Sequence, residues 1–365
     1  MSVKKAVTSK DVARVAGVSQ STVSMILSNY QNAKFTEETR RRVMEACVET
    51  GYRTLAVKNT APSSKMLLIV SPYGDNLEYA KLANVIQQRA SDLGYACFVL
   101  YTFRDANIEN SILRYLKEIP FSGIIFLYQP ENMYLLTQVE KTRPTVSVYD
   151  SNPELEMDAV ELSSLKVGRV IAEHLLSLGH VNVAYVATAV NSKYVTRLNR
   201  LQGIRNTYEA NGYDPEKCIR VCTYETENIS LDKAFSTYEA GFVLTNRVLE
   251  KYDDVTAFIG INDMTCFGII DALQRRKLRI PQDYSVCGCD NVVISGLKAV
   301  SLTSVEHFGH LRARDAVDML MKKINDQNTD RSLGESPVSI TKVEYEPKIV
   351  ARSSTGPVNP KRRIR

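Results

Sequence analysis

Residues 8–28 have the sequence TSKDVARVAGVSQSTVSMILS, which carries the pattern of two short helices joined by a tight turn. We expect the first helix to begin after Thr8, with Asp11 as the reciprocal partner of a capping box, and to end at Gly17. After a very short turn, Ser19 is placed to cap the second helix. Two helices joined in this way are typical of a helix-turn-helix unit.

A third helix is expected over Glu37–Thr50, because Thr36 can start it, acidic residues occupy its first turn and Gly51 ends it. The three helices present apolar residues at helical spacing, which predicts one small shared core. These residues are Val12, Ala13 and Ala16 in the first helix, Val23, Ile26 and Leu27 in the second, and Val43, Ala46 and Cys47 in the third. We call residues 1–53 the head.

Positive charge is concentrated at the start of the chain. The whole chain has a formal net charge of +5, but residues 1–65 hold eleven Lys and Arg against five Asp and Glu. The remaining residues hold 35 against 36. A basic segment on a nearly neutral body favours a polyanionic partner for that segment. A solvated basic face is the alternative reading.

The polar residues of the second helix suit contact with duplex DNA. Short hydroxyl and amide side chains can bind phosphate oxygens, and Gln20 or Ser21 could contact base edges. Met25 offers only an apolar contact, for example with a thymine methyl group. For any single Ser or Thr, capping and solvating a helix is an equally good explanation.

From Met66 onward, short apolar runs alternate with helical patterns. This alternation favours doubly wound parallel sheets covered by helices on both faces, in two domains better than in one. The predicted fold class is therefore α/β, with two parallel-sheet lobes preceded by a small all-α domain. The expected strands are 66–70, 96–100, 123–127, 145–148, 183–187, 219–222, 257–261 and 284–288, and the expected helices are 77–93, 108–119, 165–178, 200–211, 238–251 and 264–276.

The composition excludes several classes of protein. With 44% hydrophobic and 24% charged residues, the 365-residue chain is neither disordered nor fibrous. No apolar run approaches the ~20 residues that cross a bilayer, and the first residues do not form an export segment. The seven cysteines lack a disulfide framework spacing. We expect a reduced, soluble, cytoplasmic protein with no membrane partner.

Catalytic and metal-binding patterns are weak. The sequence contains no glycine-rich phosphate loop and no nucleophile elbow, so we expect neither an enzyme nor a cofactor. His307 and His310 could pair on a metal, but only Glu306 supports them, so we favour a surface or lobe-interface role and no metal site. Cys287 and Cys289 are expected to pack in a buried strand rather than to form a redox pair.

The motifs of the head are Lys10-Asp11-Val12-Ala13, Ala16-Gly17-Val18-Ser19, Ser21-Thr22-Val23-Ser24 and Gly51-Tyr52. With these motifs in this order, residues 7–52 resemble the DNA-binding head of the LacI/GalR family of bacterial transcriptional regulators. The body resembles the family's effector domain, which has the type I periplasmic-binding-protein fold. The motifs that carry this second resemblance include Val148-Tyr149-Asp150, Arg200-Leu201-Gln202-Gly203, Asn262-Asp263 and Cys287-Gly288-Cys289-Asp290.

The head departs from the family pattern at two positions. Met25 stands where the family usually has an arginine that contacts guanine. Ala61, followed by Pro62, stands where the family's hinge helix carries a leucine that wedges into the minor groove. We therefore expect a different half-site and a less bent operator. The candidate DNA contacts are Thr8, Ser19, Gln20, Ser21, Thr22, Ser24, Met25, Asn29, Thr36, Thr39 and Ala61.

The resemblance implies that Arg200, Asn262 and Asp290 contact a small-molecule effector in a cleft between the lobes. A guanidinium, an amide and a carboxylate can together bind vicinal hydroxyls or an acidic group. The residues expected to face them from the first lobe are Tyr73, Asp75 and Asp150. As alternatives, Asp290 could cap a strand end, and Arg200 could form a surface ion pair.

The implied fold crosses between the lobes three times, and we place the crossings near Ser163, Thr303 and Leu333. This divides the chain into five parts. They are the head over 1–53, a hinge and linker over 54–65, a first lobe over 66–163 plus 304–332, a second lobe over 164–303 plus 333–352, and a disordered basic tail over 353–365.

Together these features predict a DNA-binding transcriptional regulator, and specifically a repressor. We expect a homodimer, or a higher oligomer, that binds a palindromic double-stranded operator. A small-molecule effector, expected to be a sugar or a related metabolite, would control the affinity for the operator. The alternative is a cytoplasmic ligand-binding sensor with a vestigial DNA-binding head, which Met25 and the weak hinge favour.

Overall fold

The computed structural model describes residues 8–27, 35–50, 65–74, 76–116, 119–150, 157–188, 190, 195–223, 236–330 and 339–359. The chain divides into two compact units, Met1–Ser63 and Ser64–Arg365. Among the residues expected at the two binding sites, Asn29, Ala61 and Asp75 lie outside the described residues. The hinge and the basic end over 360–365 also lie outside them, apart from Lys65.

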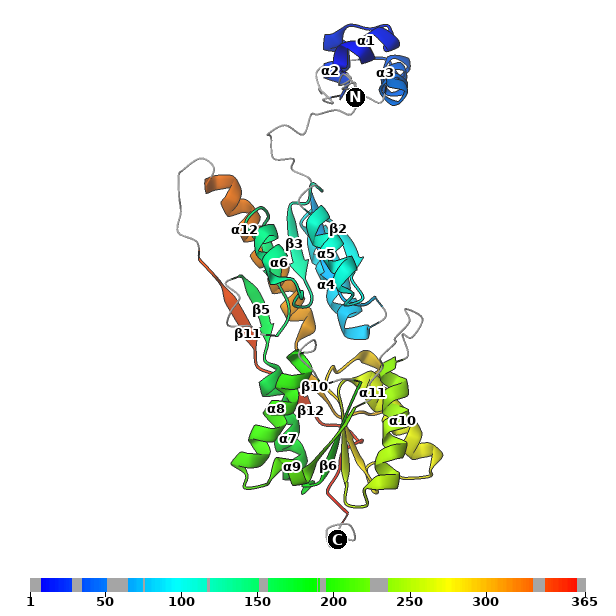
Figure 1. Ribbon diagram of the computed structural model, residues 1–365, viewed down its shortest axis with the longest axis vertical. Coiled ribbons are helices and arrows are strands. Elements are labelled where there is room, and N and C mark those ends of the chain that lie inside the picture. The colour runs from blue at the N-terminus through cyan, green and yellow to red at the C-terminus, as the bar shows by residue number, and fades with distance from the viewer. Residues whose placement is uncertain are drawn as a thin grey trace, which may run out of the picture. The chain divides into compact units, whose positions relative to one another are not determined.

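The head contains the three expected helices, which are α1 (Ser9–Ala16), α2 (Gln20–Leu27) and α3 (Glu37–Thr50) (Figure 1). Val12, Val23 and Val43, one from each helix, are fully buried in a shared apolar core. Gly17 ends α1 with a φ of 64°, a left-handed conformation in which a side chain would be strained.

The first lobe is a six-stranded parallel sheet. Its strands lie in the order β11-β5-β4-β3-β1-β2. Side chains alternate along β1, so that Leu67 and Ile69 pack under α4 and α12 while Leu68 and Val70 pack under α5 and α6. The elements of this lobe are β1 (Met66–Ser71), α4 (Leu77–Asp92), β2 (Ala96–Tyr101), α5 (Ala106–Tyr115), β3 (Gly123–Phe126), α6 (Met133–Glu140), β4 (Thr145–Ser147), β5 (Ala159–Leu162), α12 (Gly309–Asp330) and β11 (Lys342–Tyr345).

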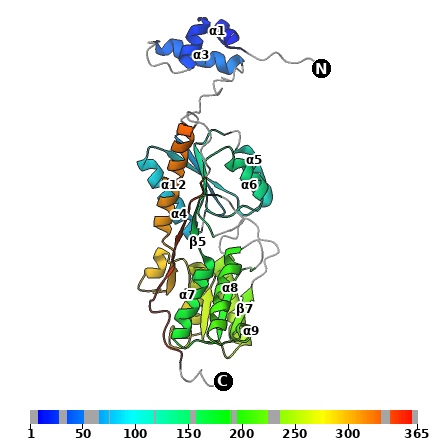
Figure 2. The ribbon, with the colours of Figure 1, turned by 90° about the vertical axis from the view of Figure 1, so that its left-hand side faces the viewer.

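The second lobe is a four-stranded parallel sheet with the order β7-β6-β8-β9. Helices α7 and α8 cover one face, on the side of Tyr185, and α10 and α11 cover the other, on the side of Val186. Figure 1 shows these two layers of helices on either side of the sheet, and Figure 2 looks onto α7 and α8. The elements are α7 (Ser164–Ser177), β6 (Val183–Ala187), α8 (Val195–Ala210), α9 (Pro215–Cys218), β7 (Ile219–Thr223), α10 (Ser236–Lys251), β8 (Ala257–Gly260), α11 (Asp263–Arg275), β9 (Ser285–Cys287) and the 3₁₀ helix η2 (Val293–Gly296).

The strand order confirms the predicted α/β class with two doubly wound lobes. All eight strands expected from the apolar runs are present. In each sheet the first strand lies between the second and the third, so the strand order reverses between β1 and β3 and between β6 and β8. In open parallel sheets, ligands bind beyond the carboxyl ends of the strands at such a reversal. The residues that follow these strands are therefore expected to bind the ligand.

The expected assignment of residues 333–352 to the second lobe is wrong for β11. This strand pairs in parallel with β5 in the first sheet, where Lys342 and the buried Glu161 form an ion pair at 3.4 Å. The next strand, β12 (Lys348–Val350), pairs with β10 (Ser304–Glu306), so the last crossing lies between β11 and β12. The charged residues of β5 and β11 hid both strands from a search for apolar runs.

The expectation of a disordered tail from residue 353 is also wrong over 353–359. The Ser354 hydroxyl donates to the carbonyl of Val286 at 2.6 Å, and the backbone nitrogen of Val286 donates to the carbonyl of Ser354 at 2.8 Å. The nitrogen of Val358 donates to the carbonyl of Leu178 at 2.9 Å. These bonds make residues 353–359 part of the second lobe.

Among the described helices, none combines the length and the apolar character needed to cross a lipid bilayer.

Two glycines allow α7 and α8 to pack in direct backbone contact. A Cβ atom built on Gly168 would lie 2.0 Å from the carbonyl oxygen of Arg200. One built on Gly203 would lie 2.0 Å from the carbonyl oxygen of Leu165. Any larger residue would separate the helices and displace Arg200, one of the expected effector contacts.

Gly203→Ala is therefore expected to lower the free energy of unfolding of the second lobe by more than about 2 kcal/mol, because backbone atoms cannot yield to the added methyl group. Gly296→Ala is the matched control, since the nearest atom to its added Cβ is the end of the Arg352 side chain at 3.7 Å. Thermal unfolding followed by circular dichroism measures both. Equal midpoints for the two variants would contradict the close-packing argument.

Candidate functional site

The polar side of α2 is exposed on the surface of the head. Gln20, Ser21 and Ser24 are exposed, whereas Val23 and Ile26 of the same helix are buried. The three polar residues occupy positions i, i+1 and i+4, which lie on one face of a helix. Helix α2 contains no charged residue. An uncharged helix with short polar side chains can enter a major groove and approach base edges closely.

Several hydroxyl groups expected at DNA act as helix caps. The Ser19 hydroxyl oxygen accepts a hydrogen bond from the backbone nitrogen of Thr22 at 3.0 Å. The Thr36 hydroxyl oxygen accepts one from the backbone nitrogen of Thr39 at 3.2 Å, at the start of α3. The N-terminus of a helix is also a favourable place for a phosphate group. Capping and phosphate contact are therefore compatible at these positions.

Three further residues of the expected DNA face are either hydrogen-bonded within the head or half-buried. The side-chain nitrogen of Gln20 donates to the hydroxyl of Ser9 at 2.9 Å, which links α2 to α1. Thr8 bonds to Asp11, whose carboxylate accepts from the backbone nitrogen of Thr8 at 2.8 Å. Met25 is half-buried. The roles of all these residues at DNA stay predictions.

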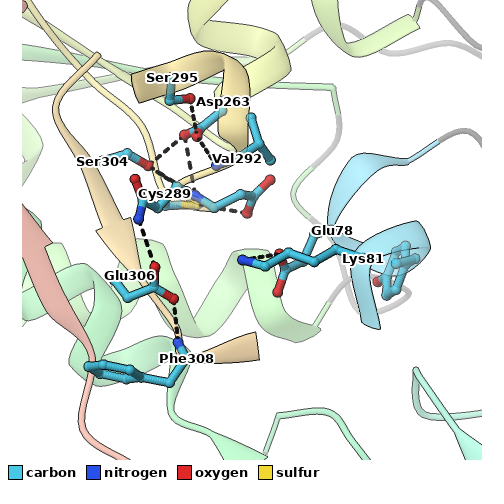
Figure 3. Close-up of polar contacts among 12 residues, drawn as sticks. Glu78, Lys81, Asp263, Cys289, Val292, Ser295, Ser304, Glu306 and Phe308 are labelled. Carbon is cyan, nitrogen blue, oxygen red and sulfur yellow. Dashed lines mark hydrogen bonds and ion pairs between the residues drawn. The ribbon is translucent and has the colours of Figure 1, made fainter. Parts of the chain in front are cut away.

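In the second lobe, one fully buried carboxylate organises the residues that follow β8 and β9 (Figure 3). Asp263 accepts hydrogen bonds from the hydroxyls of Ser295 at 2.5 Å and Ser304 at 2.6 Å. It also accepts from the backbone nitrogens of Val292 at 3.0 Å and Asp290 at 3.2 Å. A buried carboxylate is stable only when its lone pairs are satisfied. These bonds therefore fix the loop after β9.

Three of the expected effector contacts lie around this carboxylate. Asn262 caps α11, with its side-chain oxygen accepting from the backbone nitrogen and the hydroxyl of Thr265 at 2.8 and 2.9 Å. Arg200, on α8, is buried and donates through one terminal nitrogen to the carbonyl of Ile261. An electrostatic interaction joins Arg200 to Asp290. The tertiary structure thus brings together three residues that are far apart in the sequence.

The residues expected from the first lobe are placed differently. Asp150 bridges the two lobes, because its carboxylate accepts from the backbone nitrogen of Ser164 at 2.9 Å and from the amide of Asn199 at 3.1 Å. Burial raises the pKa of Asp150. Tyr73 is half-buried after β1, and its carbonyl accepts from the hydroxyl of Ser71 at 3.1 Å. A role for Tyr73 and Asp150 at an effector stays a prediction.

Sequence reasoning missed Glu78 and Arg312, which lie in a group of polar side chains between the lobes with Arg200, Asp290 and His307. Both carboxylate oxygens of Glu78, Nε2 of His307, and Nε of Arg200 and of Arg312 are buried and have no hydrogen-bond partner. Electrostatic interactions join Glu78 to Asp290 and to Arg312, and His307 to both arginines. We call Glu78, Arg200, Asp290, His307 and Arg312 the interlobe cluster. In the sequence, Glu78 and Arg312 are ordinary first-turn helix residues, so no pattern marks them.

Burial sets the protonation of the interlobe cluster. Burial, followed by the neighbouring carboxylates, holds the pKa of Asp290 well above its ordinary value. Burial also raises the pKa of Glu78. The pKa of His307 is held well below its ordinary value by burial and then by the guanidinium groups of Arg200 and Arg312. The imidazole of His307 is therefore neutral at pH 7.

These features define a class of protein. A helix-turn-helix head presents an exposed polar helix, and a two-lobed α/β unit gathers buried polar groups where its sheets present their carboxyl ends. A DNA-binding regulator that is controlled by a ligand has this organisation.

Comparison with known proteins identifies the family. Residues 8–54 match the family described as bacterial regulatory proteins, lacI family, and residues 172–355 match the periplasmic binding protein-like domain. The chain belongs to the lacI family of bacterial transcriptional regulators, as the sequence motifs predicted.

Two curated relatives have regulatory names. The chain is 28% identical over 359 residues to the HTH-type transcriptional regulator DegA of Bacillus subtilis (strain 168), covering 96% of this chain and 98% of that protein. It is 28% identical over 358 residues to the HTH-type transcriptional repressor PurR of Aliivibrio fischeri (strain MJ11), covering 95% and 98%.

Solved structures share the fold. A complex of the transcriptional regulator CelR with cellobiose has a TM-score of 0.65 at 21% identity, covering 95% of this chain and 99% of that chain. The lac repressor dimer bound to operator and the anti-inducer ONPF also has a TM-score of 0.65, at 23% identity, covering 96% and 100%. The order of head, first lobe and second lobe is therefore that of known regulators.

Asp263→Asn is expected to lower the free energy of unfolding by about 3 kcal/mol, because the amide that replaces one oxygen turns a donor toward groups that already donate. Asp253→Asn, at an exposed position of the same lobe, should stay within about 0.5 kcal/mol of the wild type. Urea unfolding measures both changes. A wild-type midpoint for Asp263→Asn would show that the loop after β9 does not depend on this carboxylate.

Proposed function

We propose that this regulator is a repressor that binds a palindromic operator as a homodimer and changes its affinity when a small molecule binds between its lobes. The observation that carries the proposal is the interlobe cluster, where five buried polar atoms of the described residues have no hydrogen-bond partner, although Glu78 forms an ion pair with Lys81 at 4.0 Å. Unpaired buried polar atoms destabilise a protein, and a polar ligand would supply the missing hydrogen bonds.

The chemistry of these atoms supports a ligand rich in hydroxyl groups. Glu78 and Asp290 can accept hydrogen bonds from hydroxyl groups, and Arg200 and Arg312 can donate to the oxygens of the same groups. The CelR complex with cellobiose, a sugar, is a relative of the same fold. We infer a sugar or a related metabolite as the effector, with Arg200, Asn262 and Asp290 as its contacts.

Control of DNA binding then follows from differential affinity. Glu78 and Arg312 belong to the first lobe, and Arg200 and Asp290 to the second, so a ligand held by all four favours one lobe arrangement over others. The ligand shifts the equilibrium only by its difference in affinity for the two arrangements. In a dimer, the change in the lobes would alter the spacing of two heads on a two-fold axis. Because it acts on DNA, we place the protein in the cytoplasm.

DNA binding is tested with the purified full chain and operator fragments selected from random duplex DNA. Gln20→Ala should relax the sequence preference at one base pair per half-site, because it removes an amide that can bind a base edge. The binding free energy for the preferred base should fall by about 1–3 kcal/mol. Ser24→Ala should weaken binding to all sequences alike. Ser177→Ala, on the surface of the second lobe, is the control without effect.

The wild-type affinity should fall by roughly 10³–10⁵ between 50 and 200 mM salt if six to ten phosphates are contacted. Fluorescence anisotropy measures each constant. A weak affinity with no sequence preference and a flat salt dependence would instead favour a ligand sensor with a vestigial head.

Effector binding is tested with Arg200→Ala. A thermal-shift screen of sugars, sugar phosphates and nucleobases first identifies a ligand that raises the unfolding midpoint. Arg200→Ala should lower the affinity for that ligand by roughly 30-fold to 1,000-fold, since it leaves buried acceptors unpaired. The substitution should also abolish the effect of the ligand on operator binding. Arg205→Ala is the matched control, because Arg205 lies on the same helix and pairs with Glu216 at 3.0 Å. Unchanged ligand affinity in Arg200→Ala would remove this residue from the site.

A further inference from the structure

Three potential metal ligands from separate parts of the chain meet between the lobes. Cys289 Sγ, a carboxylate oxygen of Asp290 and a ring nitrogen of His307 all lie within 4.8 Å of one another. Cys289 and Asp290 follow β9 in the second lobe, and His307 lies between β10 and α12, where the chain enters the first lobe. An electrostatic interaction joins Cys289 to Asp263, and Figure 3 labels both residues.

The spacing suits a small divalent cation. Zinc binds cysteine sulfur at about 2.3 Å and histidine nitrogen or carboxylate oxygen at about 2.0–2.2 Å, which sets its ligands roughly 3–4 Å apart. Side-chain movements of about 1 Å would bring the three atoms to these distances. The loop that carries Cys289 and Asp290 is already fixed by Asp263, so the site is largely formed in advance.

His307 provides an independent observation. Its side chain is only 3% exposed, and its ring forms a hydrogen bond with the backbone of Cys289, whereas its Nε2 atom has no hydrogen-bond partner. Buried imidazole nitrogens ordinarily have a partner, so this atom lacks one that a ligand can supply. Neutral imidazole is the form that binds metals. His310, the neighbour considered in the sequence, is exposed and does not belong to the group.

Acidic side chains outnumber basic ones around the interlobe cluster in the part of the chain that the structure describes. The charged groups that interact in and around the interlobe cluster are five carboxylates, Glu78, Asp150, Asp263, Asp290 and Glu306, and three cations, Lys81, Arg200 and Arg312. Burial raises the pKa of Glu78, Asp150 and Asp290, and a bound cation would favour the ionised form of each. Buried charges are tolerated when they are paired or coordinate a metal.

We propose that Cys289, Asp290 and His307 form a binding site for one divalent transition-metal cation of the zinc type. Mixed sulfur, nitrogen and oxygen ligands select such cations over magnesium or calcium. On binding, the Cys289 thiol loses its proton to solvent as the metal–sulfur bond forms. The carbonyl of Ile261, which accepts from this thiol at 3.0 Å, keeps its hydrogen bond from Arg200.

The site connects the metal to the regulation of the protein. Three protein ligands leave a fourth coordination position, which water or an oxygen of the effector can occupy. Because the ligands come from both sides of the second crossing, the bound metal would hold one lobe arrangement. Metal binding itself does not depend on the proposed function, whereas this coupling rests on it.

The experiment uses the full chain, stripped of metal with a chelator and kept reduced. Titration with zinc against a competing chromophoric chelator should give one cation per chain. Cobalt should produce a thiolate-to-metal charge-transfer band in the ultraviolet. Cys289→Ser and His307→Gln should each lower the affinity for zinc by more than about 100-fold, because losing a direct ligand costs more than the 10–100-fold loss caused by an outer-shell contact. Cys289→Ser should also abolish the cobalt band. Asp290→Asn, nearly identical in shape, should weaken zinc without loss of folding.

Cys222→Ser and His310→Gln are the matched controls, because Cys222 is a half-buried thiol of β7 and His310 an exposed histidine of α12. Both should bind zinc as the wild type does. Circular dichroism of the metal-free variants verifies that each is folded. Absence of stoichiometric binding, or equal losses in the controls, would overturn the inference while operator binding by the wild type still supports the proposed function. If the wild type binds zinc but no operator, the metal site is supported and the proposed function is overturned.

Discussion

The carboxylate of Asp263 is the constraint on which the second lobe depends. It is fully buried and accepts hydrogen bonds from two backbone nitrogens and two serine hydroxyls. Because a carboxylate in this position is stable only with all of these donors, it determines the path of the loop after β9 and ties that loop to β10. The same bonds place Cys289 and Asp290 next to the crossing segment that carries His307.

The interlobe cluster has the opposite character. Arg200, His307 and Arg312 are buried and Glu78 and Asp290 are half-buried, but several of their polar atoms lack a hydrogen-bond partner within the protein. Such groups reduce the stability of the folded chain, and proteins commonly keep them where a ligand is bound. Asp263 and the interlobe cluster therefore have different roles in the same region. Asp263 fixes the backbone, whereas the interlobe cluster offers polar atoms that can bind a ligand.

The sequence predicted elements well where the local pattern was strong. Gly17 and the buried valines of the three head helices fixed the head, and the apolar strands of both sheets gave the fold class. It failed where the pattern was mixed. Strands β5 and β11 contain charged residues that pair across the sheet, as Glu161 does with Lys342, so neither resembles a buried strand when considered alone. The last lobe crossing was misplaced for this reason.

The sequence by itself determined the helix-turn-helix head, the α/β class and the family, since these depend on spacing between neighbours in the chain. It also named Arg200, Asn262 and Asp290 through motif resemblance. Only the tertiary structure decided which polar groups meet. It engaged Asp150 with Ser164 and Asn199, and it joined His307 to Cys289 rather than to His310. Contacts of this kind depend on the pairing of strands far apart in the chain, which local patterns do not specify.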